Sequence, residues 1–174
     1  DDVFLLTWNS ATKSVQREHL PNLPSTLVYG AATTLGQKVY LAGGSETNAL
    51  STALKIFWVL DLDKKGSDSF GWQELPAWPG PSRAFNIIAA QSNGREDQVY
   101  IFSGRREGEN GELEFLKDAY AYSPSNTSWK RLADSPACMM AGEAIPIGEN
   151  HILIYPNTIV INKHHRVRIH RLMS

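Results

Sequence analysis

The sequence predicts an all-β fold assembled from repeated units of short strands. Two observations support this prediction. The same order of loop, apolar strand, turn and apolar strand occurs three times, and further pairs of strands lie before and between these segments. The composition agrees, because 42% of the 174 residues are hydrophobic and 20% are charged, which is sufficient for a packed core.

Each of the three recurring segments begins with a proline-marked or serine-proline loop. A short polar turn separates the two strands that follow, as is typical of an antiparallel hairpin. The predicted hairpin strands lie at residues 27–32 with 39–44, 84–90 with 99–104, and 140–145 with 151–155.

Strand pairs of a second kind lie before and between these hairpins. They are found at residues 3–8 with 15–18, 56–62 with 72–75, and 119–122 with 129–132. The unit is therefore four strands repeated about every fifty residues, which is the period of a kelch propeller blade. Trp72 and Trp129 begin the outermost strands, where a large ring is expected to cover the seam between blades.

A pair of glycines marks the end of the second strand in the first repeat. Gly43 and Gly44 are expected to leave the strand through a backbone conformation that disfavours a side chain. In the second repeat, Gly104 and Arg105 are predicted to occupy the corresponding positions, so an arginine replaces a structural glycine.

The blade count predicts an incomplete propeller. Residues 1–155 supply an outer half-blade, two full blades and an inner half-blade, and residues 156–174 are predicted to form a basic C-terminal tail outside the repeat pattern. Closed propellers have about four to eight blades. The chain is therefore interpreted as a fragment, a truncated product or part of an assembly, and association through the uncovered blade faces is expected.

Charge and motifs narrow the classes of function. The net charge of −1 gives no general argument for a nucleic-acid partner, and no apolar run approaches the ~20 residues of a membrane span. The chain shows no signal-peptide pattern at its start. Cys138 is the sole cysteine and is expected to be a buried hydrophobe. The motifs indicate neither a metal site nor a cofactor.

The meander topology places several charged residues on one face of the propeller. The loop that leaves the second strand opens on the same side as the loop that enters the first. These loops hold Glu46, Arg83, Arg105 and Arg106. The three arginines could hold a carboxylate through forked hydrogen bonds, whereas the alternative is that they are solvated or paired between blades.

Glu143 is the candidate catalytic residue. It lies on a predicted innermost strand, which lines the central channel of a propeller. The alternative is a structural carboxylate bonded to backbone N–H groups of a neighbouring blade.

Several motifs, taken in order, resemble the cyclically permuted branch of the sialic-acid mutarotase (N-acetylneuraminate epimerase) family. The similarity spans most of residues 1–155. It is carried by residues 23–32, 39–44, 81–86, 99–106 and 135–145.

The resemblance implies a six-bladed kelch propeller that acts as an isomerase of carbohydrate metabolism and interconverts the α and β anomers of N-acetylneuraminate. It also implies a periplasmic or secreted location. Mutarotation requires a base that takes the anomeric hydroxyl proton and an acid that protonates the ring oxygen.

The resemblance does not carry over the catalytic residue directly, because the family's proposed catalytic glutamate lies in a later Gly-Glu segment, followed by Gly-x-Arg, that has no match here. Glu143 lies in a Gly-Glu-Ala segment without the following arginine and is the candidate base by its place on an innermost strand. The alternative function is a kelch module that binds a protein or glycan without catalysis. The residues expected to bind sialic acid or a related sugar are Arg83, Arg105, Arg106, Glu46 and Asn86.

Overall fold

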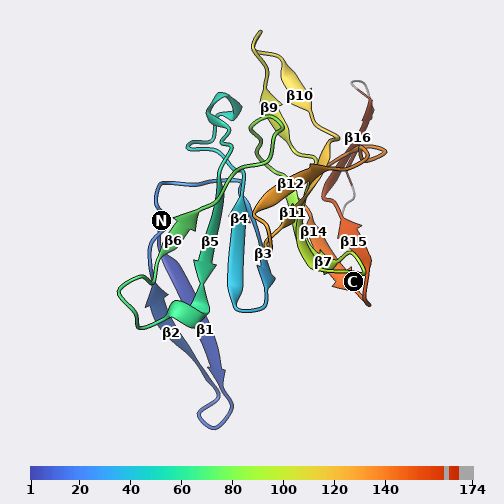
Figure 1. Cartoon of the computed structure of the whole chain (residues 1–174). Helices are drawn as coiled ribbons and strands as arrows, with labels where there is room; N and C mark the ends of the chain where they lie inside the picture. Colours follow the sequence, from blue (N-terminus) through green and yellow to red (C-terminus); the bar gives the residue numbers. More distant parts are fainter. Residues whose placement is uncertain (163–164, 169–174) are drawn as a thin grey trace.

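The computed structural model describes residues 1–162 and 165–168 and consists of antiparallel sheets joined by loops (Figure 1). Its regular helical elements in the described residues are two short 3₁₀ turns, η1 (Leu50–Thr52) and η2 (Leu62–Lys64). None of the described residues form a helix with the length and apolar character needed to cross a membrane.

Two complete four-stranded blades form the centre of the structure. Each is a meander in which consecutive strands pair side by side. Blade 1 consists of β3 (Ala31–Leu35), β4 (Lys38–Ala42), β5 (Phe57–Asp61) and β6 (Trp72–Glu74). Blade 2 consists of β7 (Ile87–Ser92), β8 (Asp97–Phe102), β11 (Ala119–Ser123) and β12 (Ser128–Arg131).

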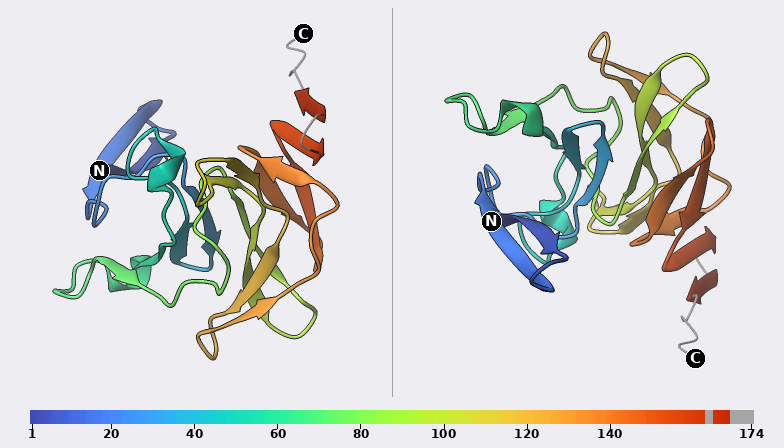
Figure 2. Two further views of the ribbon diagram at one scale, coloured as in Figure 1. Left: turned by 90° about the horizontal axis from the view of Figure 1, so that it is seen from above. Right: turned by 90° about the horizontal axis from the view of Figure 1, so that it is seen from below.

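A half-blade lies at each end of this pair. The outer half-blade is β1 (Val3–Asn9) with β2 (Ser14–Leu20), and the inner half-blade is β14 (Glu143–Ile147) with β15 (His151–Tyr155). Seen from above and below, the chain runs from β1–β2 at one end to the last strands at the other (Figure 2). The predicted all-β, incomplete kelch-type propeller of two full blades and two half-blades is confirmed.

Backbone hydrogen bonds join successive repeats at their innermost point. Tyr29, Phe85 and Ala141 precede the first strands of the three repeats and have φ values of 58°, 58° and 51°. The N–H of Phe85 donates to the carbonyl of Tyr29 at 2.9 Å, and that of Ala141 donates to the carbonyl of Phe85 at 3.1 Å. We call these three residues the pivot residues. They are evenly spaced along the sequence, so they define the repeat.

The main core lies between blades 1 and 2. Phe57 packs edge-on against Tyr122 and Trp129, with ring centroids 4.9 Å apart in both contacts. Trp129 also donates its indole N–H to the carbonyl of Pro76, and Trp72 donates in the same way to Pro21. The predicted role of both tryptophans at the seams between blades is therefore confirmed.

The expected position of the second diglycine is wrong. Gly43 and Gly44 have φ values of 64° and 105°, and the residues with matching values are Ser103 at 56° and Gly104 at 102°. Arg105 follows this pair and bridges Ala84. Arg105 therefore does not replace a glycine. Ser103 has the left-handed backbone conformation that Gly43 has in blade 1, and a sequence pattern based on glycine does not reveal this.

Regular strands continue beyond residue 155, where the sequence predicts the end of the repeats. In blade 2 a hairpin of β9 (Arg105–Glu107) and β10 (Leu113–Phe115) follows the bridge from Ala84 to Arg105. In the third repeat, Met140 pairs with Thr158. Thr158 begins β16 (Thr158–Asn162), which pairs with β13 (Cys138–Met140) and with β17 (His165–Arg168).

The hairpin of β16 and β17 thus takes the place that β9 and β10 have in blade 2. Two segments of the predicted tail, Thr158–Asn162 and His165–Arg168, are thus strands that pair with the third repeat or with each other, and the domain boundary itself stays a prediction. The rest of the basic stretch, residues 163–164 and 169–174, lies outside the described residues.

Apolar side chains are exposed at both ends of the structure. They comprise Phe4, Leu6, Trp8 and Val15 on β1–β2, and Ile145, Ile147, Leu153 and Tyr155 on β14–β15. The expectation of uncovered sheet faces at both ends is confirmed.

Candidate functional site

A pocket of about 450 Å³ lies where the innermost strands of the three repeats meet. All three pivot residues line it. Asn86, Gly142 and Glu143, which follow pivot residues directly or by two positions, also line it. The pocket is therefore formed by equivalent positions of successive blades.

Two aromatic rings form one wall of the pocket. Tyr29 and Phe85 are stacked with centroids 4.0 Å apart, and the Tyr29 hydroxyl donates to Asn48 at 3.1 Å. The guanidinium carbon of Arg105 lies 4.4 Å from the centroid of the Phe85 ring. A positive charge thus lies against the aromatic wall, an arrangement that is favourable for a cation over a π face.

Glu143 lies on the pocket, as its predicted place on an innermost strand requires. It is the first residue of β14, opposite Tyr155, and its side chain is exposed. Glu143, the candidate base predicted from the sequence, is therefore among the residues that line this pocket. Its catalytic role stays a prediction.

Asn86 lines the pocket from blade 2 and also connects two blades. Its side chain is 2% exposed, and its Nδ2 donates to the carbonyl of Ala42 at 3.2 Å. A Cβ on Gly43 would lie 2.2 Å from the Asn86 Oδ1, so the glycine leaves room for this amide. Within the described residues, that oxygen accepts no hydrogen bond. Its role in binding a sugar stays a prediction.

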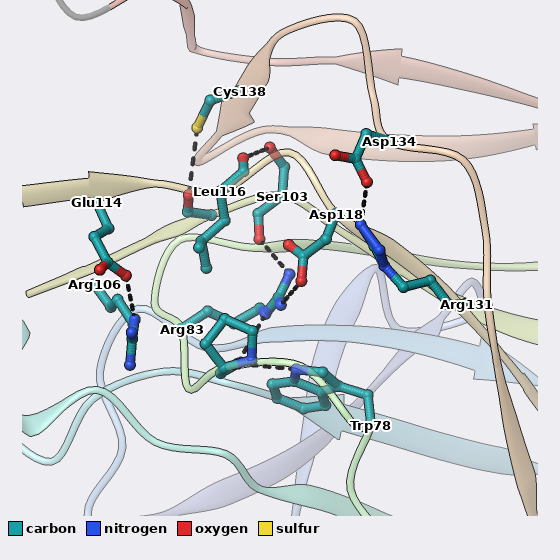
Figure 3. Close-up of polar contacts among 12 residues, drawn as sticks. Trp78, Arg83, Ser103, Arg106, Glu114, Leu116, Asp118, Arg131, Asp134 and Cys138 are labelled. Carbon is teal, nitrogen blue, oxygen red and sulfur yellow. Dashed lines mark hydrogen bonds and ion pairs between the residues drawn. The ribbon is translucent and has the colours of Figure 1, made fainter. Parts of the chain in front are cut away.

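Arg83 is buried and does not line the pocket; its role as a substrate contact stays a prediction. The residue is 0% exposed, and its Nη2 lies 2.6 Å from the Asp118 carboxylate (Figure 3). Nη1 donates to the carbonyl of Ser103 at 2.9 Å, and the guanidinium lies over the rings of Trp78 and Tyr120. The guanidinium is enclosed by these groups, and its carboxylate partner Asp118 directly precedes β11 of the same blade that Arg83 leads into.

Arg106 and Glu46 lie away from the pocket lining. Arg106 forms a 2.5 Å ion pair with Glu114 across the β9–β10 hairpin, as Figure 3 shows. Glu46 is exposed in the loop of blade 1, where its backbone N–H donates to Thr52. The structure therefore brings Glu143 and Asn86 to the pocket and Arg105 to its wall, but not the other three candidates.

Three residues important to this region were not predicted from the sequence. Tyr29 and Phe85 form the aromatic wall, and Asp118 holds Arg83. The even spacing of the two aromatic residues immediately before the inner strands is the signal that could have identified them.

Cys138 is a buried core residue, as the sequence predicts. Cys138 is buried and its thiol donates to the carbonyl of Gly104 at 3.3 Å; burial raises the pKa of this thiol, which disfavours the thiolate. Among residues 1–162 and 165–168, no cluster of three or more His, Cys, Asp or Glu side chains is placed to hold a metal ion.

Comparison with known proteins gives consistent matches. The family model described as N-acetylneuraminate epimerase matches residues 20–158. The N-acetylneuraminate epimerase of Haemophilus influenzae (strain PittEE) is 29% identical over 153 residues, which cover 87% of this chain and 37% of that protein. A Kelch domain-containing protein of Vibrio cholerae serotype O1 is 34% identical over 114 residues, covering 65% of this chain and 28% of that protein.

A solved structure described as that of YjhT shares the fold. The TM-score is 0.62 at 20% identity, with 81% of this chain matched to 37% of that chain. The matched part of this chain therefore spans well under half the length of these relatives. Because the family model covers most of the sequence, the chain belongs to the N-acetylneuraminate epimerase family.

Proposed function

We propose that this chain contributes part of the substrate channel of a sialic-acid mutarotase, an isomerase that interconverts the α and β anomers of N-acetylneuraminate. The observation that carries the proposal is the position of Glu143 on a pocket walled by aromatic rings. Membership of the family supports the choice of substrate.

The chemistry needs one group that accepts a proton near the anomeric carbon. The Glu143 carboxylate takes the proton of the anomeric hydroxyl, the bond from the anomeric carbon to the ring oxygen breaks, and an acid protonates that oxygen. Reclosure on the other face of the resulting ketone gives the opposite anomer and returns both protons.

The wall of the pocket suits the rest of the sugar. Arg105 lies against Phe85, where its charge can attract the carboxylate of the substrate. The stacked rings of Tyr29 and Phe85 offer an apolar surface to the C–H face of a pyranose. Asn86 also lines the pocket, beside Phe85.

NMR exchange spectroscopy of freshly dissolved N-acetylneuraminate tests the proposal. We expect the chain to accelerate α–β exchange, and Glu143→Gln to reduce the acceleration at least tenfold because an amide does not accept the proton. Glu149→Gln is the matched control, since Glu149 is exposed in the turn between β14 and β15 and does not line the pocket. Equal acceleration by the two variants would refute the role of Glu143.

A second candidate function is sugar binding without catalysis. It is favoured by the lining of the described pocket, in which Glu143 is the only residue with a carboxyl side chain. Saturation-transfer NMR separates the two: binding of N-acetylneuraminate without faster anomer exchange indicates a binding module.

The family resemblance further suggests a periplasmic or secreted location. Fractionation of cells that carry the complete gene tests this proposal, and recovery of the protein in the cytoplasm would contradict it.

A further inference from the structure

A second cavity lies at the seam between blades 1 and 2, at the end of the strands opposite to the Glu143 pocket. The Glu143 pocket is lined by Ala31, the first residue of β3. The second cavity has a volume of about 170 Å³ and is lined by Lys38, which lies opposite Leu35 at the other end of β3. We call it the seam cavity. It therefore lies on the face of the blades away from the proposed substrate channel.

Both complete blades line the seam cavity. Its charged and phenolic lining residues are Lys38, Tyr40 and Asp61 from the strands of blade 1, Lys64 from η2 of the same blade, and Tyr122 from β11 of blade 2. Two lysines and one aspartate leave one net positive charge in this lining. Because each of the two blades is a complete four-stranded sheet, the cavity does not depend on the half-blades.

Two tyrosine hydroxyl groups in this lining have no partner in the described protein. Tyr40 is 2% exposed and Tyr122 is 1% exposed, and both rings pack in the main core. Within residues 1–162 and 165–168, neither hydroxyl makes a hydrogen bond. A buried hydroxyl that lacks a partner is costly, so such a group usually meets a ligand or a water molecule.

Both phenols are in the form that donates a hydrogen bond. Burial raises the pKa of Tyr122, and burial, followed by the neighbouring Tyr122 and Asp61, raises the pKa of Tyr40. Each hydroxyl therefore keeps its proton at neutral pH. A group that accepts hydrogen bonds is the complement of two such donors.

Lys64 adds an ammonium group without a carboxylate partner. Its side chain is half-buried and forms no ion pair in the part of the chain that the structure describes. The adjacent Lys65 instead pairs with Glu18, with 2.6 Å between the charged atoms. A charge that is partly withdrawn from water attracts an opposite charge more strongly than a fully solvated one. Lys64 is therefore suited to hold an anion in the cavity.

The turn that carries Lys64 is held in place by hydrogen bonds. The Asp61 Oδ1 accepts from the N–H of Asp63 at 3.2 Å, and the N–H of Leu62 donates to the carbonyl of Gln37 at 2.8 Å. The second bond ties η2 to the turn between β3 and β4, where Lys38 lies. The Lys38 Nζ is 3.8 Å from the Asp61 Oδ2, which is too long for a hydrogen bond, so its N–H groups are available to a ligand.

We propose that the seam cavity binds a small molecule through a phosphate or carboxylate group, held by Lys38 and Lys64 and by the hydroxyls of Tyr40 and Tyr122. All four groups donate hydrogen bonds, and those from an ammonium group to an oxyanion are about twice as strong as neutral ones. The volume lies below the ~300–1,000 Å³ of pockets for drug-sized ligands, so the enclosed group is small. The proposal does not rest on the proposed mutarotase function, since the two cavities share no lining residue.

Titration with sodium phosphate and, separately, with sodium malonate tests the proposal. Amide NMR spectra of the whole chain are recorded at neutral pH and constant ionic strength, because added salt alone screens surface charges. We expect saturable shifts at Lys38, Lys64 and Tyr122. A response to phosphate alone identifies a phosphate site, a response to malonate alone a carboxylate site, and a response to both a general oxyanion site. The absence of saturable shifts there with either anion would overturn the proposal.

A lysine variant tests the charge in the cavity. Lys64→Gln should raise the Kd of the bound anion about tenfold, because it removes a charge-assisted hydrogen bond. The matched control is Lys130→Gln, since Lys130 is exposed on β12 and does not line the cavity. An equal loss of affinity in the two variants would show an effect of overall charge and contradict the site.

Tyrosine variants separate a ligand contact from a structural role. Tyr40→Phe and Tyr122→Phe remove hydroxyls that have no hydrogen-bond partner among the described residues, so each should weaken anion binding about threefold or more without lowering Tm. Tyr100→Phe is the control, because Tyr100 lies on β8 outside the cavity and its change should leave the Kd unaltered. If both cavity variants bind the anion as well as the unaltered chain, or only lower Tm, the hydroxyls serve the fold and the proposed site is wrong.

Discussion

The buried pair of Arg83 and Asp118 makes the sharpest prediction for stability. The Arg83 side chain is 0% exposed and that of Asp118 is 12% exposed, with 2.6 Å between the charged atoms. Removing one partner of a buried ion pair leaves the other charge uncompensated, which costs about 3–5 kcal/mol. Arg83→Met keeps most of the side-chain volume and should therefore lower the free energy of unfolding by roughly that amount.

The expected loss corresponds to a fall in Tm of about 10 °C for a chain of this size, by the scaling of about 2–4 °C per kcal/mol. Urea unfolding followed by tryptophan fluorescence measures the free energy directly. All variants must be compared at one chain concentration, because association would add to the apparent stability. The double variant Arg83→Met with Asp118→Leu should recover part of the loss, since neither charge then remains buried alone.

The pair formed by Arg131 and Asp134 provides the control. Their side chains are 50% and 54% exposed, so Arg131→Met should cost about 0–1 kcal/mol. If Arg83→Met is no more destabilising than Arg131→Met, or if it alters only sugar binding, the interpretation of Arg83 as a structural residue is wrong.

Two further predictions concern a glycine and a carboxylate. Gly43→Ala should destabilise the fold by about 1–3 kcal/mol more than Gly36→Ala in urea unfolding. Both glycines have a positive φ, but of the two only Gly43 would bring an added Cβ within 3 Å of a carbonyl and an amide of blade 2. Similar costs would contradict the close approach. Hydrogen bonds from Ser125 and Ser123 hold the pKa of Glu96 below its ordinary value. The stabilisation by ionised Glu96 is thus present at neutral pH and lost as the pH falls through the lowered pKa. Thermal unfolding should show that Glu96→Gln is less stable than the unaltered chain at pH 7 and that the difference shrinks below pH ~4; a constant difference would refute the assignment.

The repeat unit was predictable because its signal is local. Alternating apolar strands, turns and the tryptophans all lie within one blade, and the structure places them as expected. The partner of Arg83 is different in kind, because Asp118 lies 35 residues away, in the loop that precedes β11. A single sequence does not show which carboxylate a buried arginine will meet.

The structure differs from the sequence prediction at Ser103 and after residue 155, and the two differences have related causes. The left-handed conformation of Ser103 lies at a position where sequence reasoning expects glycine. The link between the second and third strands varies between repeats: η1 lies in that link in blade 1, a hairpin of β9 and β10 in blade 2, and a hairpin of β16 and β17 in the third repeat. Segments that change in every repeat carry no periodic signal, so the sequence predicts a tail at residues 156–174, where the structure has β16 and β17.

The pivot residues show how the repeat and the site are related. Their backbone is the same in each repeat, and each non-glycine residue in the left-handed region costs about 1 kcal/mol, which the hydrogen bonds between successive repeats offset. Their side chains differ, because two are stacked aromatic rings and the third, Ala141, has only a methyl group. The small side chain lies two positions before Glu143, so the space beside the candidate base comes from the one repeat that lacks a ring. The propeller thus keeps its backbone constant at the channel and varies the side chain there, and this variation forms the pocket.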